Sequence, residues 1–570
     1  MSDGDSVPSR PGNVPDDALR HVNDIPAITS AGPLELTPFE LFLHRMDNRS
    51  GALVFRVALQ FSGDVNRDLL SLAFRASARR HQLLNSVLQP VGNSGGAEAE
   101  LCHWEHVSRE PSLEILWSCD VAGSSNQTGG GVADAADSDE MPRFDDVCGT
   151  DLLQTFPPVR AIDLTQQSAL CATAITRPDR DSPVAEPTVP PSEYNSATND
   201  GRSTEERESL RILLNFHHTA CDGMGARQLI ADWFHLYDRL CRGETPALAE
   251  YETERLMNRG QVRRPPTVEP LSFREAVRNF YVTVCGRTAR LRSGTTSSVS
   301  AAAGERQSVS HKTVPHAATP QIPEASAVKN HRHSPTWLHQ HAFSEEETAS
   351  IRAWLRRQGV SINDVGVAVC MQTFAELFDD VSPRHLITVL NPVDIRLPSD
   401  RRLSAANKTG FTYLRRRRRE CLLQTPTELL KSIREQTTYI KERFVGPDFI
   451  HGLERLSRRP WALRLMIRSG LFTPSLQFTC LGDTTRGRRY GFRIQDDRFV
   501  VGDLTLINIT AWAPVAPGVP LSIAACETNS RLTFTVRADP EYLSDAQAQR
   551  YLQRLADRIT AYVGESDDAA

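Results

Sequence analysis

One stretch near the middle of the chain constrains the fold most strongly. Residues 210–216 (LRILLNF) form a short, mostly apolar run that is typical of a β-strand. This run continues without a break into residues 217–223, which read HHTACDG. Beyond them, large apolar residues recur at three- and four-residue steps from Leu229 to Leu240, and this spacing predicts a helix with one apolar face. Strand and helix patterns alternate in this way through both halves, so the sequence predicts an α/β protein.

The loop between this strand and helix carries the strongest candidate for chemistry, His218. A neutral imidazole with an ordinary pKa of about 6.5 can take a proton from a hydroxyl or amine and later return it to a leaving thiolate. Gly223 is expected to permit a close backbone approach just after the loop. The opposing interpretation is that a histidine at a strand end is a hydrogen-bonded core residue, and H-x-x-x-D often arises by chance. The paired histidines, the Asp-Gly step and the flanking elements together favour His218 as a general base.

The seven residues HHTACDG resemble the HHxxxDG signature of the chloramphenicol-acetyltransferase-like superfamily. This group includes condensation domains of nonribosomal peptide synthesis, polyketide-associated acyltransferases, alcohol acetyltransferases and wax ester/diacylglycerol acyltransferases. Weaker similarities to the family lie in four further segments: LTPFE at 36–40, AIDL at 161–164, SINDV at 361–365, and NPVDIR at 391–396 followed by NKTG at 407–410. The resemblance covers most of the ordered chain. It implies two α/β lobes that form a V-shaped pseudo-dimer with a tunnel between them.

The resemblance also implies roles for individual residues. His218, the second histidine, is the expected base, and His217 is a packing or hydrogen-bonding neighbour. Asp222 is expected to point away from the substrate and to form a salt bridge that holds the loop, with Arg396 as our candidate partner. The tunnel is expected to include Asn407 and Gly410. No metal or organic cofactor is implied, and the acyl donor is a thioester of coenzyme A or of an acyl carrier protein.

Two departures from the family pattern bear on the subfamily. The DFGWG-like motif that many members carry late in the second lobe is missing, and residues 501–515 read VGDLTLINITAWAPV there. Instead, QFTCLGD at 477–483 looks like the SNLG strand and turn of alcohol acetyltransferase-type members. No carrier-protein or adenylation segment is found. The sequence therefore favours a free-standing transferase that acylates an alcohol or amine, closest to the alcohol acetyltransferase, polyketide-associated and wax ester/diacylglycerol types.

Two other functions remain open from the sequence alone. The protein could keep the fold as a non-catalytic scaffold, because long insertions could occlude the tunnel. It could also be a stand-alone condensation-type domain that forms amides on carrier-bound substrates. Neither the acyl chain length nor the acceptor is encoded by any motif. A run of five arginines at 415–419 is either a solvated strand edge or a contact for coenzyme A phosphates or an anionic membrane.

Composition divides the 570 residues into segments. Stretches rich in Gly, Ser, Pro and Asp cannot bury a core, so they are predicted to be flexible. The predicted order is a leader at 1–32, a first lobe at 33–292 with insertions near 121–140 and 178–208, a linker at 293–335 and a second lobe at 336–570.

Charge, cysteine usage and hydropathy limit the partners and the compartment. The net charge of −5 gives no electrostatic reason to expect nucleic acid. The 11 cysteines form no CxxC pair, which indicates reduced thiols in a cytoplasmic protein rather than a disulfide framework or a zinc site. The N-terminus has no apolar core of a signal peptide, and no run is long enough to span a membrane. We expect a cytoplasmic monomer, with peripheral membrane contact left open.

Overall fold

The computed structural model describes residues 32–47, 53–90, 102–106, 113–117, 161–176, 208–245, 250–265, 288–291, 336–470, 472–484, 491–495 and 498–564, with several single positions between them. The leader predicted at 1–32, the insertions near 121–140 and 178–208, and the linker at 293–335 lie outside the described residues, apart from a few single positions. The predicted lobe boundaries therefore stay predictions.

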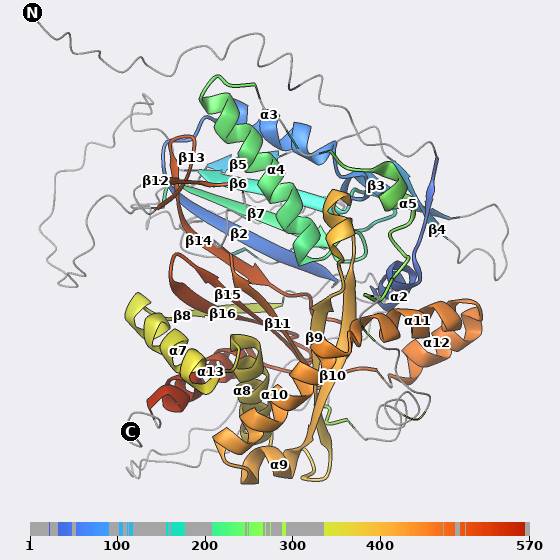
Figure 1. The fold of residues 1–570 in the computed structure, drawn as a ribbon, viewed down its shortest axis with the longest axis vertical. Coiled ribbons are helices and arrows are strands. Elements are labelled where there is room, and N and C mark those ends of the chain that lie inside the picture. Colours follow the sequence, from blue (N-terminus) through green and yellow to red (C-terminus); the bar gives the residue numbers. More distant parts are fainter. Residues whose placement is uncertain are drawn as a thin grey trace, which may run out of the picture.

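The first half of the chain supplies the upper lobe of Figure 1, with α3 and α4 packed on one face of a sheet. Its elements are β1 (Leu34–Glu35), α2 (Pro38–Asp47), β2 (Val54–Gly63), α3 (Arg67–Ala78), the 3-10 helix Gln82–Asn85, β3 (Ser86–Pro90), β4 (Cys102–His106), β5 (Leu113–Trp117), β6 (Leu170–Thr176), β7 (Leu210–His217), α4 (Gly223–Cys241) and α5 (Thr253–Met257).

The second half supplies the lower lobe, in which helices again cover a sheet. The elements of the second half of the chain, of which β12, β13 and β14 join the sheet of the first lobe, are β8 (Trp337–Ala342), α7 (Glu345–Gln358), α8 (Ile362–Leu377), β9 (Leu386–Asp394), the 3-10 helix Pro398–Arg402, β10 (Thr409–Arg417), α9 (Arg418–Leu423), α10 (Pro426–Glu442), α11 (Gly446–Ser457), α12 (Pro460–Ser469), β11 (Leu476–Asp483), β12 (Arg493–Gln495), β13 (Arg498–Val501), β14 (Leu504–Trp512), β15 (Leu521–Thr528), β16 (Arg531–Ala538) and α13 (Asp545–Gly564).

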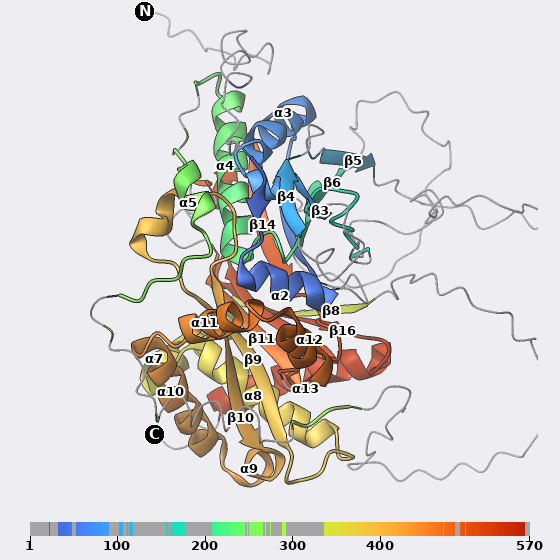
Figure 2. The same ribbon diagram turned by 90° about the vertical axis from the view of Figure 1, so that its right-hand side faces the viewer.

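Two large mixed sheets organise the lobes. The first has the order β12-β13-β14-β2-β7-β6-β5, and the second has the order β10-β9-β11-β15-β16-β8. A small third sheet, β1-β4-β3, lies in the first lobe. The expected two-lobed α/β fold is therefore present, and Figure 2 shows the two lobes from the side with α2 between them.

The lobes are joined by strands that cross from one half of the sequence to the other. β14 belongs to the second half of the chain but pairs antiparallel with β2 of the first lobe, with Ala511 opposite Val57. β12 and β13 extend the same sheet beyond β14. This exchange is a departure from the simple division of the sequence at its linker, because residues 491–512 complete the sheet of the first lobe. The exchange ties the two halves together by main-chain hydrogen bonds rather than by side-chain packing alone.

Several helix starts and turns are determined by residues that are neighbours in the sequence. Thr37 and Glu40 cap α2 reciprocally, and Ser344 with Glu347 forms a capping box at the start of α7. β15 and β16 form a hairpin, with Asn529 and Ser530 at positive φ in the turn. Each of these features depends only on residues close together in sequence.

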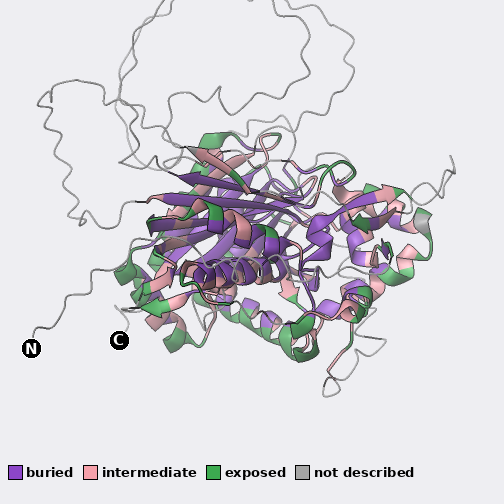
Figure 3. Cartoon of the chain, turned by 90° about the horizontal axis from the view of Figure 1, so that it is seen from above, coloured by how far each residue is buried: buried purple, intermediate pink, exposed green. Residues whose placement is uncertain are grey.

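Apolar residues gather into separate cores, one in each lobe. Figure 3 shows the buried residues in purple along the strands and the inner sides of the helices. In the first lobe α3 and α4 pack together, and the buried Trp233 donates its indole N–H to the Leu70 carbonyl at 2.9 Å. A smaller cluster joins α2 of the first lobe to α11 and α12 of the second, with Phe42, Leu453 and Leu463 buried in it. This third cluster lies beside the loop that carries His218.

Candidate active site

The HHTACDG loop is held rigidly at both of its ends. His217 is the last residue of β7, where it pairs with Val54 of β2, and the His218 N–H donates to the Leu53 carbonyl at 2.7 Å. Asp222 is the N-cap of α4, since its side chain accepts from the Gly225 N–H at 2.9 Å. The loop therefore sits between a central strand and a long helix, as its sequence context predicts, and its side chains have fixed positions.

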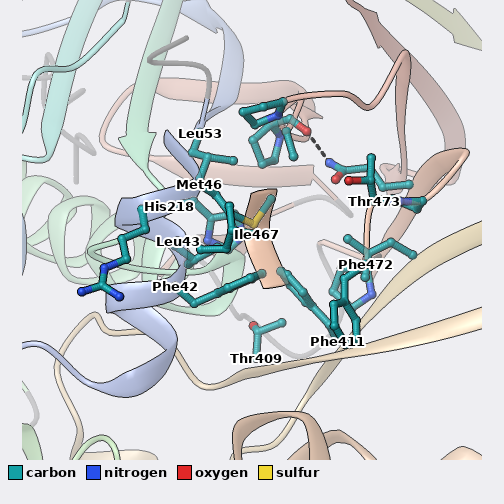
Figure 4. A pocket seen from close by; sticks show the side chains of 18 of the residues that line it. Phe42, Leu43, Met46, Leu53, His218, Thr409, Phe411, Ile467, Phe472 and Thr473 are labelled. Atoms are coloured by element: carbon teal, nitrogen blue, oxygen red, sulfur yellow. Dashed lines mark hydrogen bonds between the residues drawn. The ribbon is translucent and has the colours of Figure 1, made fainter. Parts of the chain in front are cut away.

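His218 lines a cavity between the lobes (Figure 4). Its ring packs edge-on against Phe55, with 5.4 Å between the ring centroids. Burial lowers the pKa of His218 below its ordinary 6.5, and the negative charge of Asp222 opposes that shift only in part. Nδ1 is buried within the loop, where the ring interacts with the backbone of His218 and Cys221, so Nε2 is the ring nitrogen left for the cavity. The imidazole is therefore neutral near pH 7, which is the state that a general base requires.

Asp222 and Arg396 are brought together across the lobes. The Arg396 guanidinium donates to both carboxylate oxygens of Asp222, at 2.9 and 2.8 Å, and both side chains are largely buried. Asp222 also accepts from the Lys408 N–H at 2.8 Å and the Thr409 hydroxyl at 2.9 Å. Both oxygens of its carboxylate are therefore hydrogen-bonded, and these bonds hold the loop against residues 396–409 of the second lobe.

The ionisation of Asp222 follows from these contacts. Burial acts to raise the pKa of Asp222, but the charge and hydrogen bonds of Arg396, with the N–H donors of Lys408 and Gly225, outweigh it and bring the pKa to about 2. The carboxylate is therefore charged at any physiological pH and cannot exchange a proton with a substrate. This geometry fits an anchor of the loop rather than a member of a proton relay.

His217 makes a different set of contacts from its neighbour. Its Nε2 lies 3.0 Å from Oδ2 of Asp47, and its Nδ1 accepts from the Thr219 N–H at 3.2 Å. Asp47 also accepts from the Leu53 N–H at 2.9 Å, so it joins the end of α2 to β2 and β7. His217 is buried and lies outside the cavity lining. His217 is therefore a buried residue that hydrogen-bonds with both α2 and the backbone of the loop.

Asn407 and Gly410 do not line the cavity, which differs from the expectation that they form the tunnel. The Asn407 amide instead donates to the carbonyls of His218 and Thr219, so it fixes the backbone of the loop. A Cβ at Gly410 would lie 2.5 Å from the carbonyl oxygen of Gly446. Gly410 is therefore required by the close approach of β10 to α11 and not by a substrate.

The two glycines that follow the loop have roles that differ from the expectation for Gly223. A Cβ at Gly223 would meet no atom within 4 Å, and this residue faces the cavity. A Cβ at Gly225 would lie 3.1 Å from the backbone of Ala406. The close approach therefore occurs at Gly225, where α4 packs against the second lobe.

We expect Gly225→Ala to lower the free energy of unfolding by about 1–3 kcal/mol, because the backbone of Ala406 cannot move aside without disturbing the loop contacts. Gly223→Ala serves as the matched control and should change the free energy of unfolding by less than about 0.5 kcal/mol. Urea unfolding of both variants measures the difference. Equal destabilisation by the two substitutions would contradict this assignment of the close approach.

The cavity has a volume of about 650 Å³ and is walled by both lobes. Apolar and aromatic side chains make most of its wall, and Figure 4 shows Phe411 and Phe472 across the space from Leu43 and Met46. Further lining residues are Phe42, Leu53, Leu390, Pro392, Tyr413, Met466, Pro474, Phe478, Ala513, Pro514, Ala516 and Pro517. Its size is in the range of sites that enclose small organic ligands.

Several of the residues that build this site are marked by no motif in the sequence. Asp47 contacts His217 from 170 positions away, and the cavity wall on α12 lies in a segment that no motif marks. Asp47 had one weak local signal, its place at the end of the amphipathic helix that begins at Thr37. The contacts themselves depend on how the lobes pack.

Cys221 and the arginine run at 415–419 make contacts that give them no part in the proposed proton transfer. Cys221 is fully buried, and burial raises the pKa of its thiol well above the ordinary value, so it acts as a small packing residue. Within the arginine run, Arg416 donates to Ser432 and Gln436, and Arg418 is buried and donates to the Ala375 and Val381 carbonyls. The run is thus not one solvated edge. The described residues contain no group of His, Cys, Asp or Glu side chains arranged to hold a metal ion.

None of the helices in the described part of the chain is both long enough and apolar enough to cross a membrane.

Comparison with known proteins identifies the fold. No family model and no curated protein matches the sequence. Among solved structures, TRI3 trichothecene 15-O-acetyltransferase from Fusarium sporotrichioides is similar at 12% identity and a TM-score of 0.56, covering 94% of this chain and 97% of that one. The first condensation domain of the calcium-dependent antibiotic synthetase is similar at 12% identity and a TM-score of 0.55, with the same coverage.

A third structure extends the likeness. The starter condensation domain of rhizomide synthetase, solved as a mutant in complex with C8-CoA, is similar at 10% identity and a TM-score of 0.52. It covers 94% of this chain and 95% of that one. Both lobes are included at this coverage. The chain therefore shares the two-lobed fold of these condensation-domain and acyltransferase structures, which is the fold that the resemblance of its HHTACDG loop implied.

Proposed function

We propose that the protein is an acyltransferase that moves an acyl group from a thioester donor to a hydroxyl or amine acceptor, with His218 as general base. The observation that carries this proposal is the position of His218 on the wall of a cavity of about 650 Å³, with its pKa lowered and Nε2 available. A neutral base facing an enclosed, mostly apolar space is the arrangement that such a transfer needs.

The proposed reaction uses one proton and one side chain. Nε2 of His218 accepts the proton of the acceptor hydroxyl or amine as its oxygen or nitrogen attacks the thioester carbonyl carbon. The tetrahedral intermediate then collapses, the carbon–sulfur bond breaks, and His218 returns the proton to the departing thiolate. The products are the ester or amide and the free thiol. No electron acceptor, metal or further co-reactant is needed.

The other loop residues are positioning residues in this proposal. Asp222 is held by Arg396 and donates no proton, while Asn407 fixes the carbonyls of His218 and Thr219. Their combined effect is to hold the imidazole ring in one place before the substrates bind. Because the base is already fixed in position, less entropy is lost when the two substrates are brought together with it.

The apolar wall supports an acyl donor that carries a hydrocarbon chain. Aromatic and aliphatic side chains from α2, β10 and α12 surround the space, so burying an acyl chain there is favourable. Acyl-coenzyme A is the proposed co-substrate, since a starter condensation domain of this fold has been solved with C8-CoA. No bound cofactor is proposed. The open cavity beside His218 favours catalysis over a non-catalytic scaffold, whose tunnel would not need to be kept clear.

A donor panel tests the proposal. Purified protein is incubated with acyl-coenzyme A of two to sixteen carbons (about C2–C16), with a mixture of small alcohols and amines as acceptors. Free thiol is followed by absorbance, and acylated products are identified by mass spectrometry. We expect acceptor-dependent thiol release. Release from an acylated carrier protein alone would instead indicate the condensation-type function, and no release from either donor class would overturn the proposal.

A further inference from the structure

Helix α12 exposes two large apolar side chains on one face. Trp461 is 64% exposed and Leu465 is 60% exposed. They are four residues apart in a helix, so they lie one above the other on the same face. Exposed large apolar residues that lie together mark a contact with another protein or a membrane more often than scattered ones do.

The same face is bordered by positive charge. Arg464 and Arg468 follow Trp461 at three and seven positions, which places them beside the apolar pair on the helix. The turn before the helix adds the exposed Arg458 and Arg459. From residue 452 to residue 470 the chain has five arginines and a single acidic residue, Glu454, which pairs with Arg458 at 3.2 Å. This surface therefore carries a strong excess of positive charge.

The opposite face of α12 belongs to the cavity wall. Leu463 is fully buried and Met466 is 8% exposed in the cluster that joins α2, α11 and α12. Met466 and Ile467 line the cavity itself, and Arg464 and Arg468 at the border of the two faces also contribute to its lining. In Figure 1 the helix lies at the right-hand edge of the molecule beside α11. One short helix thus separates the candidate active site from the outside.

We propose that α12 and the arginine-rich turn before it, residues 458–468, dock on the surface of an anionic lipid bilayer. Tryptophan and leucine side chains insert at the boundary between headgroups and acyl chains, and arginines bind the lipid phosphates around them. Each arginine near an anionic surface adds to the attraction, and the sum is sensitive to salt. Net charge elsewhere does not oppose the contact strongly, since the whole chain carries only −5.

A second copy of the chain fits this surface less well. Two copies meeting through the same face would bring their arginines together around a twofold axis, and like charges would repel there. A bilayer with acidic headgroups supplies the opposite charge over the whole face. The lipid surface therefore accounts for both the apolar pair and the arginines, whereas self-association accounts for the apolar pair alone.

Vesicle co-sedimentation of the full chain tests the docking. Vesicles of phosphatidylcholine with and without about one third phosphatidylglycerol are mixed with the parent protein at low and high salt. We expect binding to the anionic vesicles that weakens with salt, and a loss of at least about tenfold in the partition constant for Trp461→Ser/Leu465→Ser. Arg458→Gln/Arg459→Gln should weaken binding by severalfold on anionic vesicles only.

The matched control is a second exposed apolar pair, Leu422 and Leu423 on α9, which are 47% and 82% exposed. Leu422→Ser/Leu423→Ser should bind vesicles as the parent does. Equal losses in both pairs, or binding that ignores lipid charge, would overturn the proposal. A dimer detected by light scattering that dissociates in Trp461→Ser/Leu465→Ser, without vesicle binding, would assign the face to a second copy instead.

The docking does not depend on the proposed activity, and the two are tested separately. His218→Ala should bind vesicles with the affinity of the parent, because His218 lies inside the cavity. Thiol release from soluble acyl-coenzyme A should be unchanged in Trp461→Ser/Leu465→Ser, since neither side chain lines the cavity. Failure of vesicle binding with intact transfer would therefore reject the docking and leave the transferase standing.

Discussion

Arg396→Met is expected to lower the free energy of unfolding by about 3–5 kcal/mol, because it leaves the buried Asp222 carboxylate without its counter-charge. Arg396 donates to both oxygens of Asp222 and also to the Ala406 carbonyl at 2.9 Å. The remaining donors from Gly225, Lys408 and Thr409 are neutral and cannot balance a full negative charge. Chemical denaturation at pH 7, followed by tryptophan fluorescence, measures the loss.

Two further variants separate this pair from ordinary surface charge. Arg402 pairs with Glu252 at 2.9 Å but is 64% exposed, so Arg402→Met should cost less than about 1 kcal/mol. The double variant Asp222→Asn/Arg396→Met should recover part of the loss, since it removes both buried charges. A single variant Arg396→Met as stable as the parent would show that Asp222 does not anchor the loop.

Acid should reproduce part of this effect. The pKa of Asp222 is about 2 in the folded protein, below its ordinary value of 3.8. A lowered pKa means that the ionised form is favoured by folding, so this stabilisation is fully present above about pH 4 and is lost as pH falls through 2. The shift corresponds to about 2 kcal/mol. We expect the stability gap between parent and Asp222→Asn to narrow over this interval, and a gap that stays constant from pH 6 to pH 2 would contradict the assignment.

The parts of this protein that the sequence predicts well are those fixed by near neighbours. Ser344 finds Glu347 three residues away, and the strand before His217 leads directly into the loop. The resemblance of HHTACDG to a family motif added the two-lobed fold and pointed to Arg396 as the partner of Asp222. Those two residues are 174 positions apart, and no periodicity in the sequence joins them.

The parts that the sequence did not predict depend on packing between the lobes. β14 pairs with β2 of the first lobe, although the sequence pattern of β14 indicates only a strand and not its partner. Asn407 and Gly410 follow a family-like pattern, yet they face the loop backbone and α11 because β10 passes close to both. The cavity wall on α12 comes from a segment whose amphipathic pattern predicts a helix but not what its two faces meet.

His218→Ala is expected to lower the turnover number of acyl transfer by about 10²–10⁴-fold, the usual contribution of a general base. The imidazole is the ring that accepts the acceptor proton, and its lowered pKa keeps it neutral at pH 7. In the parent, activity should be retained above this pKa and lost as pH falls through it, because protonation removes the base. His218→Gln keeps a side chain of similar length without basicity and should fall equally.

A structural role for His218 predicts a different outcome. If His218 only filled space, His218→Gln would retain most of the activity that His218→Ala loses. His217→Ala tests the role of the neighbouring histidine. It should lower the stability of the protein through the lost Asp47 contact, and it should change the pH profile of activity less. Thermal unfolding of each variant shows whether the protein compared in the assay is folded.

The most direct test of the whole account is the rate of acyl transfer by folded His218→Ala and parent protein, measured side by side with the donor that the panel selects. We expect product formation, read by mass spectrometry at equal folded concentrations, to fall by at least about a hundredfold in the variant. Equal rates of transfer by the two proteins would contradict the claim that His218 is the base of this site.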